Sequence, residues 1–355
     1  MDHDLTLLHV TDETFPSYKS DVKELFEREF TNRGHKIYHL FFSSDVNKIE
    51  EVQEGNNIYY LFPYDSRLPL SFFKKINLPQ IKNFINNILK NKSIDIIQVR
   101  SCPYLGKTSS DLAKKHKIPF CYYLTSLFTD FKKKSFFYEK NFKNSYKLLE
   151  GHFEETLYRK VIKKSDLFQP ISTEMDEYFK KMTDNKKTLP LPMCAPRKFL
   201  ESKAKSNSNS SNKIVYIGQI SLLRDPLFLL KVIKTIEDRI KDVELIFVGP
   251  PTNKKVVPKL RQTAKRYGIS DNVKFLGKVD KEKIPQILRD CDIGVSPLPP
   301  ILSYKMSSPT KVVEYLSIGL PVICNKEIVD QNQVVSKSGG GFSVRYDHEE
   351  FVDKL

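Results

Sequence analysis

The sequence lacks any long hydrophobic run, because no segment approaches the ~18 uninterrupted apolar residues that a membrane-spanning helix needs. It also lacks the basic start of a secretory signal, since the first residues, Met1-Asp2-His3-Asp4, are acidic and lead directly into an apolar stretch. From these two absences we expect a cytoplasmic protein.

Closely spaced cysteine pairs are missing as well, so neither a disulfide framework nor a zinc site is indicated. The five cysteines are scattered, and several of them lie in apolar runs and are best interpreted as small core residues of a reduced protein. The five are Cys102, Cys121, Cys194, Cys291 and Cys324.

What the chain does have is length, apolar content and positive charge. Its 355 residues are 40% hydrophobic, enough for two domains with a core each. The net charge of +15 favours an anionic partner, either nucleic acid, phospholipid or a phosphorylated substrate. Charge alone does not choose among these.

Apolar strand patterns alternate with amphipathic helix patterns along the first half, which predicts an α/β domain with a largely parallel sheet. The expected strands cover residues 5–10, 36–42, 94–99, 120–124 and 167–171, and the expected helices cover residues 20–33, 109–116 and 146–164 and begin again at 173.

A polar stretch without apolar residues, 202–212, interrupts this pattern, which then restarts. We therefore expect an N-terminal domain over 1–200, a flexible linker over 201–212 and a second α/β domain over 213–355. The last domain ends just inside a helix pattern that begins near His348, so we expect it to be truncated. Two such domains predict a ligand in a cleft between them.

The segment 307–323 predicts a phosphate-binding helix start. Ser308 suits the N-cap and Pro309 the first helical position, so the following N–H groups offer an anion site. Glu314 lies further along the same helix, where a carboxylate can accept the two hydroxyls of a ribose.

A second segment, 216–226, leaves a strand and enters a helix. Gly218 there permits close approach of a ligand to the backbone, and Arg224 can bind a phosphate with two hydrogen bonds. The alternative is an ordinary turn whose arginine is solvated or pairs with Asp225. Two further strand ends, 275–279 and 294–300, carry Gly or Pro, and all four segments are expected at one edge of the sheet.

Taken together, residues 213–344 resemble the nucleotide-sugar domain of the retaining family 4 glycosyltransferases, which have the GT-B architecture of two Rossmann-like domains facing across a cleft. The matching motifs are Tyr-Ile-Gly…Arg-Asp-Pro (216–226), Leu-Ile-Phe-Val-Gly (245–249), Phe-Leu-Gly-Lys-Val (275–279), Cys-Asp-Ile-Gly-Val-Ser-Pro-Leu (291–298), Ser-Pro-Thr-Lys-Val-Val-Glu-Tyr-Leu-Ser-Ile-Gly-Leu-Pro-Val-Ile (308–323) and the glycines 339–341 followed by Phe342.

The resemblance implies roles for individual residues. Arg224, Lys311 and Glu314 are the expected catalytic residues, and Glu314 holds the nucleotide ribose. The donor site is expected to comprise Gly218, Arg224, Lys278, Ser308, Pro309, Thr310, Lys311 and Glu314. The donor is expected to be a UDP- or GDP-sugar, with no cofactor and no metal; Asp290-Cys291-Asp292 has the spacing of a metal motif but sits at a strand entry.

The chain departs from the family at several positions. The first glutamate of the family's pair, eight residues before Glu314, falls on Met306. Basic residues common in the first loop are replaced by Gln219 and Asp225, and the usual N-domain histidine has no counterpart among residues 122–126. These differences leave an atypical donor or reduced activity open.

The segment 130–164 holds ten Lys/Arg against five Asp/Glu, interleaved with Phe131, Phe136, Phe137, Tyr138 and Phe142. Such a surface fits contact with anionic lipid at the inner face of the membrane and a lipid-linked or glycan acceptor, and a solvated basic face over core aromatics fits equally. No recognisable nucleic-acid-binding module accompanies the charge.

The function expected is therefore transfer of a sugar from a nucleotide-diphosphate sugar to a hydroxyl acceptor, with retention, in glycan or cell-envelope synthesis. A non-catalytic nucleotide-sugar-binding protein and a nucleotide-sugar epimerase or hydrolase of similar architecture remain alternatives.

Overall fold

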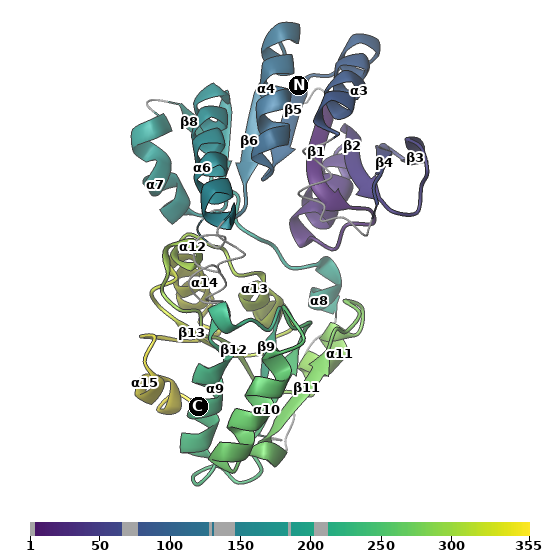
Figure 1. Cartoon of the computed structure of the whole chain (residues 1–355). Coiled ribbons are helices and arrows are strands. Elements are labelled where there is room, and N and C mark those ends of the chain that lie inside the picture. The colour runs from purple at the N-terminus through teal and green to yellow at the C-terminus, as the bar shows by residue number, and fades with distance from the viewer. Residues whose placement is uncertain (1–3, 66–76, 128–129, 131–145, 184–185, 202–211) are drawn as a thin grey trace. The chain divides into compact units, whose positions relative to one another are not determined.

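The computed structural model describes all residues except 1–3, 66–76, 128–129, 131–145, 184–185 and 202–211. The chain divides into two compact units, Met1–Pro192 and Met193–Leu355. Figure 1 colours the first from purple to teal and the second from teal through green to yellow.

The N-terminal unit is built on an eight-stranded sheet in the order β3-β4-β2-β1-β5-β6-β7-β8. Neighbouring strands are parallel except for the β3–β4 hairpin at one edge, which is visible in Figure 1. The strands are β1 (Thr6–Thr14), β2 (Lys36–Ser43), β3 (Glu50–Glu54), β4 (Asn57–Pro63), β5 (Ile96–Arg100), β6 (Phe120–Leu124), β7 (Leu167–Pro170) and β8 (Lys187–Thr188).

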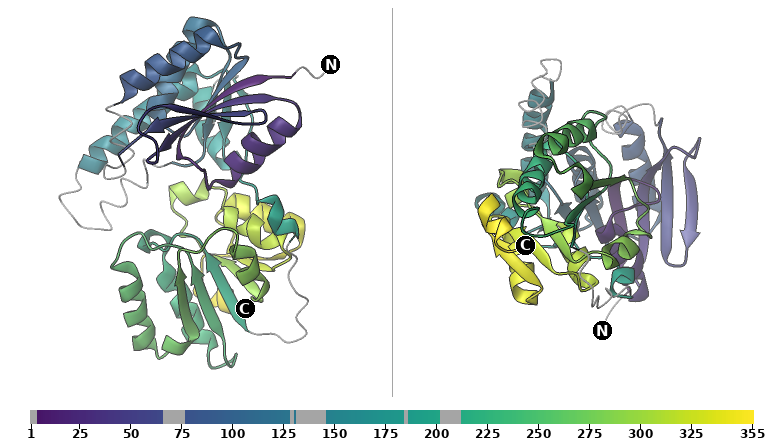
Figure 2. Two further views of the ribbon diagram at one scale, coloured as in Figure 1. Left: turned by 90° about the vertical axis from the view of Figure 1, so that its right-hand side faces the viewer. Right: turned by 90° about the horizontal axis from the view of Figure 1, so that it is seen from below.

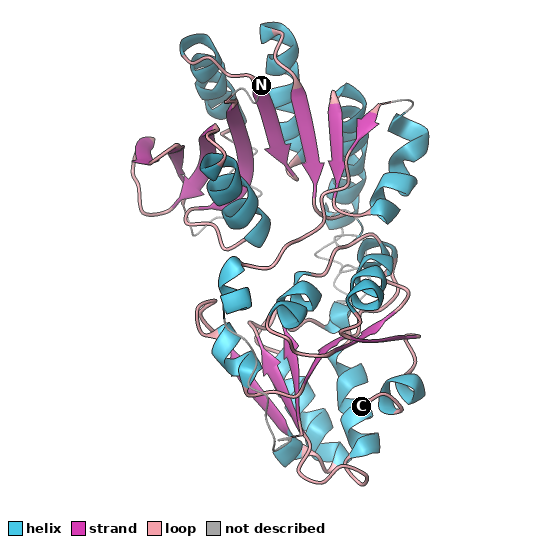
Figure 3. Ribbon diagram, turned by 180° about the vertical axis from the view of Figure 1, so that it is seen from behind, coloured by secondary structure: helices cyan, strands magenta, loops and turns pink. Residues whose placement is uncertain are grey.

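Helices connect these strands and cover both faces of the sheet, as Figure 3 shows. The segment expected as a helix over 20–33 is a π-helix that continues for one short α-helical turn. The helices are η1 (Asp21–Glu29), α1 (Phe30–Asn32), α3 (Leu78–Asn91), α4 (Pro103–His116), α6 (Tyr146–Lys164) and α7 (Thr173–Thr183).

The C-terminal unit has a six-stranded sheet in the order β11-β10-β9-β12-β13-β14, and every adjacent pair is parallel. Figure 2 shows helices on both of its faces. The elements are α8 (Arg197–Glu201), β9 (Lys213–Ile217), η3 (Leu222–Arg224), α9 (Pro226–Ile236), β10 (Glu244–Val248), α10 (Val256–Tyr267), η4 (Ser270–Asn272), β11 (Val273–Gly277), α11 (Ile284–Arg289), β12 (Ile293–Ser296), α12 (Leu302–Lys305), α13 (Thr310–Ser317), β13 (Val322–Asn325), α14 (Val329–Ser338), β14 (Gly341–Val344) and α15 (His348–Val352).

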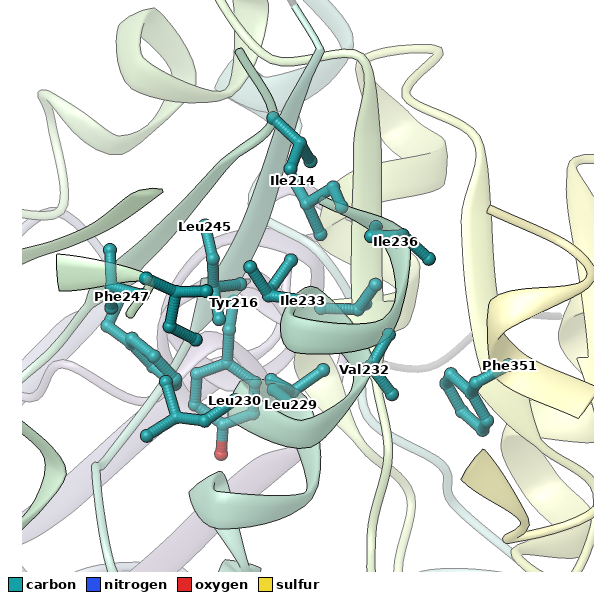
Figure 4. Packing of buried hydrophobic residues seen from close by; sticks show 14 of the residues in the cluster. Ile214, Tyr216, Leu229, Leu230, Val232, Ile233, Ile236, Leu245, Phe247 and Phe351 are labelled. Carbon is teal, nitrogen blue, oxygen red and sulfur yellow. The ribbon is translucent and has the colours of Figure 1, made fainter. Parts of the chain in front are cut away.

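Strand β9 is buried on both faces, as expected for the centre of a parallel sheet. Ile214 and Tyr216 pack on one face against α9, where Figure 4 shows Tyr216 beside Leu229 and Leu230. The alternate residues of β9 pack on the other face with α13. The alternating strand and helix patterns of the sequence thus predict the α/β fold of both units correctly.

The second unit begins earlier in the chain than the boundary at 200 that the sequence suggested. Phe199 of α8 is fully buried in the core that lies under α13, so α8 belongs to this unit. An aromatic side chain contributes a large apolar area wherever it is buried, which explains the attachment. Most of the expected linker, residues 202–211, lies outside the described residues.

A buried polar chain crosses the N-terminal sheet. His9 on β1 and His39 on β2 are register partners, and both are fully buried with Nδ1 atoms 3.1 Å apart. His39 Nε2 lies 2.9 Å from Asn57 Oδ1, while Asn57 Nδ2 donates to the Glu27 carbonyl oxygen. Because the amide nitrogen is engaged by a carbonyl, its oxygen must accept from His39 Nε2–H.

This arrangement fixes the tautomers of both rings. With its proton on Nε2, neutral His39 accepts at Nδ1, so His9 donates from Nδ1 and its own Nε2 carries the lone pair. Burial lowers the pKa of His39 to about 4, although the hydrogen bond to Asn57 opposes it. Burial, followed by the proximity of His39 and Arg100, also lowers the pKa of His9.

We predict that the N-terminal sheet loses stability as the pH falls below the unfolded histidine pKa of ~6.5. A group whose pKa is depressed by folding stabilises fully above its unfolded value and loses that contribution below it. His39 alone accounts for about 2 kcal/mol between pH 6.5 and pH 5. The measurement is hydrogen-exchange protection of β1 and β2, corrected for intrinsic exchange, at pH 7.5 and pH 5.

The control compares His39→Gln with His152→Gln, which changes an exposed histidine on α6. The first substitution should flatten the pH dependence and the second should preserve it. Equal pH dependence in the wild type and His39→Gln would show that the buried pair is not responsible.

Candidate functional site

The strand order of the C-terminal sheet singles out one crevice. β9 leads to β10 and β11 on one side, while β12 begins the other side, so the connection reverses between β9 and β12. In open α/β sheets ligands bind at the carboxyl ends of strands at such a reversal. Gly218 follows β9 directly, and α13 lies beyond β12.

Tyr315 holds α13 in this crevice. Its hydroxyl accepts from the Ile217 N–H at 2.8 Å and donates to the Val215 carbonyl oxygen at 3.2 Å. The ring lies so close to β12 that a Cβ at Gly294 would be 2.6 Å from it. The fully buried Tyr315 therefore fixes the first turns of α13 beside the end of β9.

The side chains of Arg224 and Lys311 both lie close to Gly218. Its φ of +129° disfavours other residues, and its N–H donates to the Val248 carbonyl oxygen at 2.8 Å. A Cβ at this position would lie 3.2 Å from Arg224 Nη1 and 3.6 Å from Lys311 Cε. The structure thus brings together Gly218, Arg224 and Lys311, three of the residues proposed from sequence.

Arg224 ends the short turn η3, whose start is capped by Ser221 Oγ accepting from the Leu223 N–H at 3.1 Å. The guanidinium lies 6.0 Å from the centre of the Tyr304 ring. The Asp225 carboxylate, a partner suggested for this arginine by the sequence, instead accepts from the Tyr346 hydroxyl at 3.0 Å.

Lys311 is the most unusual group of the site. Its residue is 6% exposed, its ammonium lies 3.8 Å above the centre of the Tyr216 ring, and Nζ has no hydrogen-bond partner among the described residues. Burial, aided by the nearby Arg224, lowers the pKa of Lys311 to about 8. A buried ammonium that lies over an aromatic face without a hydrogen-bond acceptor has donor hydrogens to offer a ligand.

The two cations, Lys311 and Arg224, change the pKa of the Tyr216 phenol. Burial alone would raise the pKa of its phenol, but the adjacent Lys311 and Arg224 outweigh burial and lower it. The site therefore has a strongly positive local potential, which favours a bound anion.

Glu314 lies one turn beyond Lys311 on α13 and is also buried. Burial raises the pKa of its carboxyl to about 7, while Lys281 and Lys311 oppose that shift. Lys281 Nζ is 3.9 Å from Glu314 Oε1. A carboxylate and two cations thus occupy adjacent positions at the crevice.

The start of α13 differs by one residue from the sequence prediction. The helix begins at Thr310, and Pro309 is the N-cap with extended backbone angles of −73° and 106°. Ser308 was predicted wrongly as the cap, because its Oγ accepts the Met193 N–H at 3.0 Å instead. Pro309, Thr310 and Lys311 still line the positive end of the helix.

The structure also shows the surroundings of three other positions noted in the sequence. Lys278 is exposed just after β11, and no contact within the described residues ties it to Arg224 or Lys311. Met306, at the expected position of a second carboxylate, is 6% exposed and ends α12, so an apolar side chain occupies that place. Asp292 of the metal-like motif accepts the Lys213 N–H at 2.8 Å at the start of β9.

The sequence reasoning missed three residues of this site, Tyr216, Tyr304 and Lys281. Tyr216 has the pattern of an ordinary strand residue. Lys281 is one of several lysines in its loop. The sequence offered one signal for Tyr216. Side chains two residues apart lie on the same face of a strand, and Tyr216 lies two residues before Gly218.

Comparisons with known proteins bear on the family and the fold of the chain. Residues 211–355 match the family model described as glycosyl transferases group 1. The C-terminal unit is a glycosyl transferases group 1 domain, and the protein is a glycosyltransferase. The narrower family 4 assignment and the retaining outcome stay predictions.

Solved structures match the fold of the whole chain. Sucrose-phosphate synthase from Thermosynechococcus elongatus superposes with a TM-score of 0.73 at 13% identity, covering 99% of this chain and 88% of that one. The trehalose-6-phosphate structure from E. coli bound with UDP-2-fluoro glucose gives 0.70 at 11% identity, with 99% and 90% coverage. Anabaena HepE in complex with UDP and glucose gives 0.63 at 14% identity, with 98% and 88% coverage.

Comparison with curated protein sequences finds no significant match. Within the described part of the chain, no helix combines the length and hydropathy required to cross a bilayer. The same residues contain no cluster of three or more His, Cys, Asp or Glu with metal-binding geometry.

We predict that Lys311→Met stabilises the glycosyltransferase by about 1–3 kcal/mol, because a buried cation without a hydrogen-bond partner is replaced by an apolar chain of similar length. The measurement is the free energy of unfolding of the full chain without ligand at pH 7. Lys305→Met, which changes an exposed lysine of α12, is the control and should lie within ~0.5 kcal/mol of the wild type. A loss of stability in Lys311→Met would show that the ammonium is stabilised by the fold itself.

Proposed function

We propose that the protein transfers a sugar from a UDP- or GDP-sugar to a hydroxyl acceptor with retention, without a cofactor. The observation that supports this most directly is the Lys311 ammonium, which is buried without a hydrogen-bond partner next to Arg224 and above Gly218. Two cations at a sheet reversal, beside a helix start, suit a diphosphate.

In the reaction proposed, the bond between the sugar C1 and the diphosphate oxygen breaks and a bond from C1 to the acceptor oxygen forms on the same face. The acceptor proton passes to the departing phosphate oxygen. Arg224 and Lys311 stabilise the negative charge that develops on the diphosphate, which is the main electrostatic requirement of this step. Glu314 accepts the ribose hydroxyls and so positions the donor.

Two alternative functions differ in what happens to the donor. A non-catalytic nucleotide-sugar-binding protein is favoured by Met306, because the apolar side chain removes a carboxylate that would contact the sugar. An epimerase would convert the donor without any acceptor. Product analysis with and without acceptor separates the three functions: glycoside only with acceptor, isomerised donor without it, or no turnover.

We predict that Glu314→Ala and Arg224→Ala each weaken binding of the donor nucleotide at least tenfold while leaving the fold intact. The first removes the acceptor of the ribose hydroxyls, and the second removes a charge-assisted hydrogen bond to phosphate. The measurement is the thermal shift produced by UDP-, GDP-, ADP- and CMP-sugars, in which a bound donor stabilises by mass action.

The matched control is Lys259→Ala, which removes an exposed lysine from α10 and should leave the shift unchanged. If both site variants are stabilised as strongly as the wild type by the donor, the site is assigned to the wrong residues.

We also propose that the protein contacts anionic membrane and takes a lipid-linked or glycan acceptor. The aromatic residues 131–142 that suggested this lie outside the described residues. In the described part, Leu149 and Phe153 of α6 are 75% and 58% exposed and lie one turn apart on one face. With a net charge of +15, such a face suits an anionic lipid surface. We do not propose nucleic acid as a partner, because the sequence contains no recognisable nucleic-acid-binding module.

For this surface we predict that the double substitution Leu149→Asp and Phe153→Asp lowers binding to phosphatidylglycerol-containing vesicles at least fivefold in a sedimentation assay. Loss of apolar insertion and added negative charge both act against binding. Leu200→Asp, at an equally exposed leucine of α8, is the control and should keep most of the binding. Equal losses in both proteins would refute a specific α6 surface.

A further inference from the structure

Lys281 lies near Glu314, although the two residues come from different parts of the C-terminal unit. It lies in the loop between β11 and α11, and its Nζ is 3.9 Å from Glu314 Oε1. The two side chains are 20% and 10% exposed, so solvent screens their attraction only weakly. The pair therefore joins this loop to the centre of the donor site.

Two cations act on the Glu314 carboxylate: Lys281 from the loop and Lys311 from the same helix. Burial opposes both and raises the pKa of Glu314 to about 7. Near neutral pH this carboxyl is thus balanced between its charged and neutral forms. Any change in the surrounding charge shifts that balance.

We propose that Lys281 is a positioning residue that keeps the Glu314 carboxylate ionised and oriented for the hydroxyls of the donor nucleoside. The inference rests on the proposed function and goes beyond it, since Lys281 acts through Glu314. An ionised carboxylate accepts at both oxygens, whereas a protonated one offers a donor in place of an acceptor. Two vicinal hydroxyls therefore bind the ionised form better.

The test is calorimetric titration of the full chain with UDP, GDP, ADP and CDP, using the tightest binder, between pH 6 and pH 9. The variants are Lys281→Met and Lys281→Gln, with Lys281→Arg to restore the charge. The control is Lys283→Met, which removes an exposed lysine of the same loop whose Nζ lies 3.9 Å from Asp280 Oδ2.

Removal of the Lys281 charge raises the pKa of Glu314. Protonation of Glu314, and the loss of nucleotide affinity that it causes, therefore occurs at a higher pH in the variant than in the wild type. If the pKa rises by about one unit, the ratio of variant to wild-type Kd is about five at pH 7 and falls below two at pH 9. Titration of Lys311 changes the Kd of both proteins, so its effect cancels in the ratio. Lys281→Arg and Lys283→Met should give ratios near one throughout.

A second measurement separates action through Glu314 from direct contact with the nucleotide. In a Glu314→Gln background, Lys281→Met should cause no further loss. A Kd ratio near one at every pH, a constant ratio above one, or an undiminished loss in that background would each overturn the proposal. If the wild type binds none of the four nucleotides, the proposed function itself fails.

Discussion

The constraint on which the site depends is a buried lysine without a hydrogen-bond partner. The fold places the Lys311 ammonium over the Tyr216 ring and beside Arg224, and burial lowers the pKa of Lys311. Burial of an unpaired charge costs several kcal/mol. Tyr315 holds Lys311 in this position. The Tyr315 hydroxyl hydrogen-bonds to the backbone of β9, and Lys311 lies one turn earlier on the same face of α13. An anion of two negative charges would offset the cost, as a diphosphate does.

The N-terminal unit contains a buried histidine pair and a buried arginine that hydrogen-bond within the fold. His9 and His39 share one hydrogen bond and extend it through Asn57 to a backbone carbonyl. The buried Arg100 likewise bonds to Asp21 and Glu13 at 2.7 and 2.8 Å. The buried arginine is thus paired with carboxylates inside the fold, and the orphaned Nε2 atom belongs to a histidine that is neutral. Lys311 differs because the orphaned group is a cation, and an unsatisfied buried cation suggests that a ligand supplies its partner.

Hydrophobic periodicity was sufficient to predict the α/β fold, the parallel sheets and many of the expected elements, because strands buried on both faces leave a clear apolar run. The position after a strand end also selected Gly218 and Arg224, and the resemblance to the glycosyltransferase family added Lys311. The cap of α13 was missed because Ser308 bonds to Met193, more than a hundred residues away, and local sequence holds no sign of such a contact. Lys281 was missed because the sequence does not distinguish it from the other lysines of its loop. Only the structure shows that its Nζ lies 3.9 Å from Glu314 Oε1.

The central claim is that Gly218, Arg224 and the start of α13 bind the diphosphate of a nucleotide-sugar. Its most direct test is hydrogen exchange of the full chain with a nucleoside diphosphate and, separately, with the nucleoside alone. The account predicts that UDP or GDP protects residues 217–224 and the first turn of α13, and that uridine or guanosine does not. Protection of these segments by the nucleoside alone, or by neither ligand while the diphosphate protects another region, would contradict it.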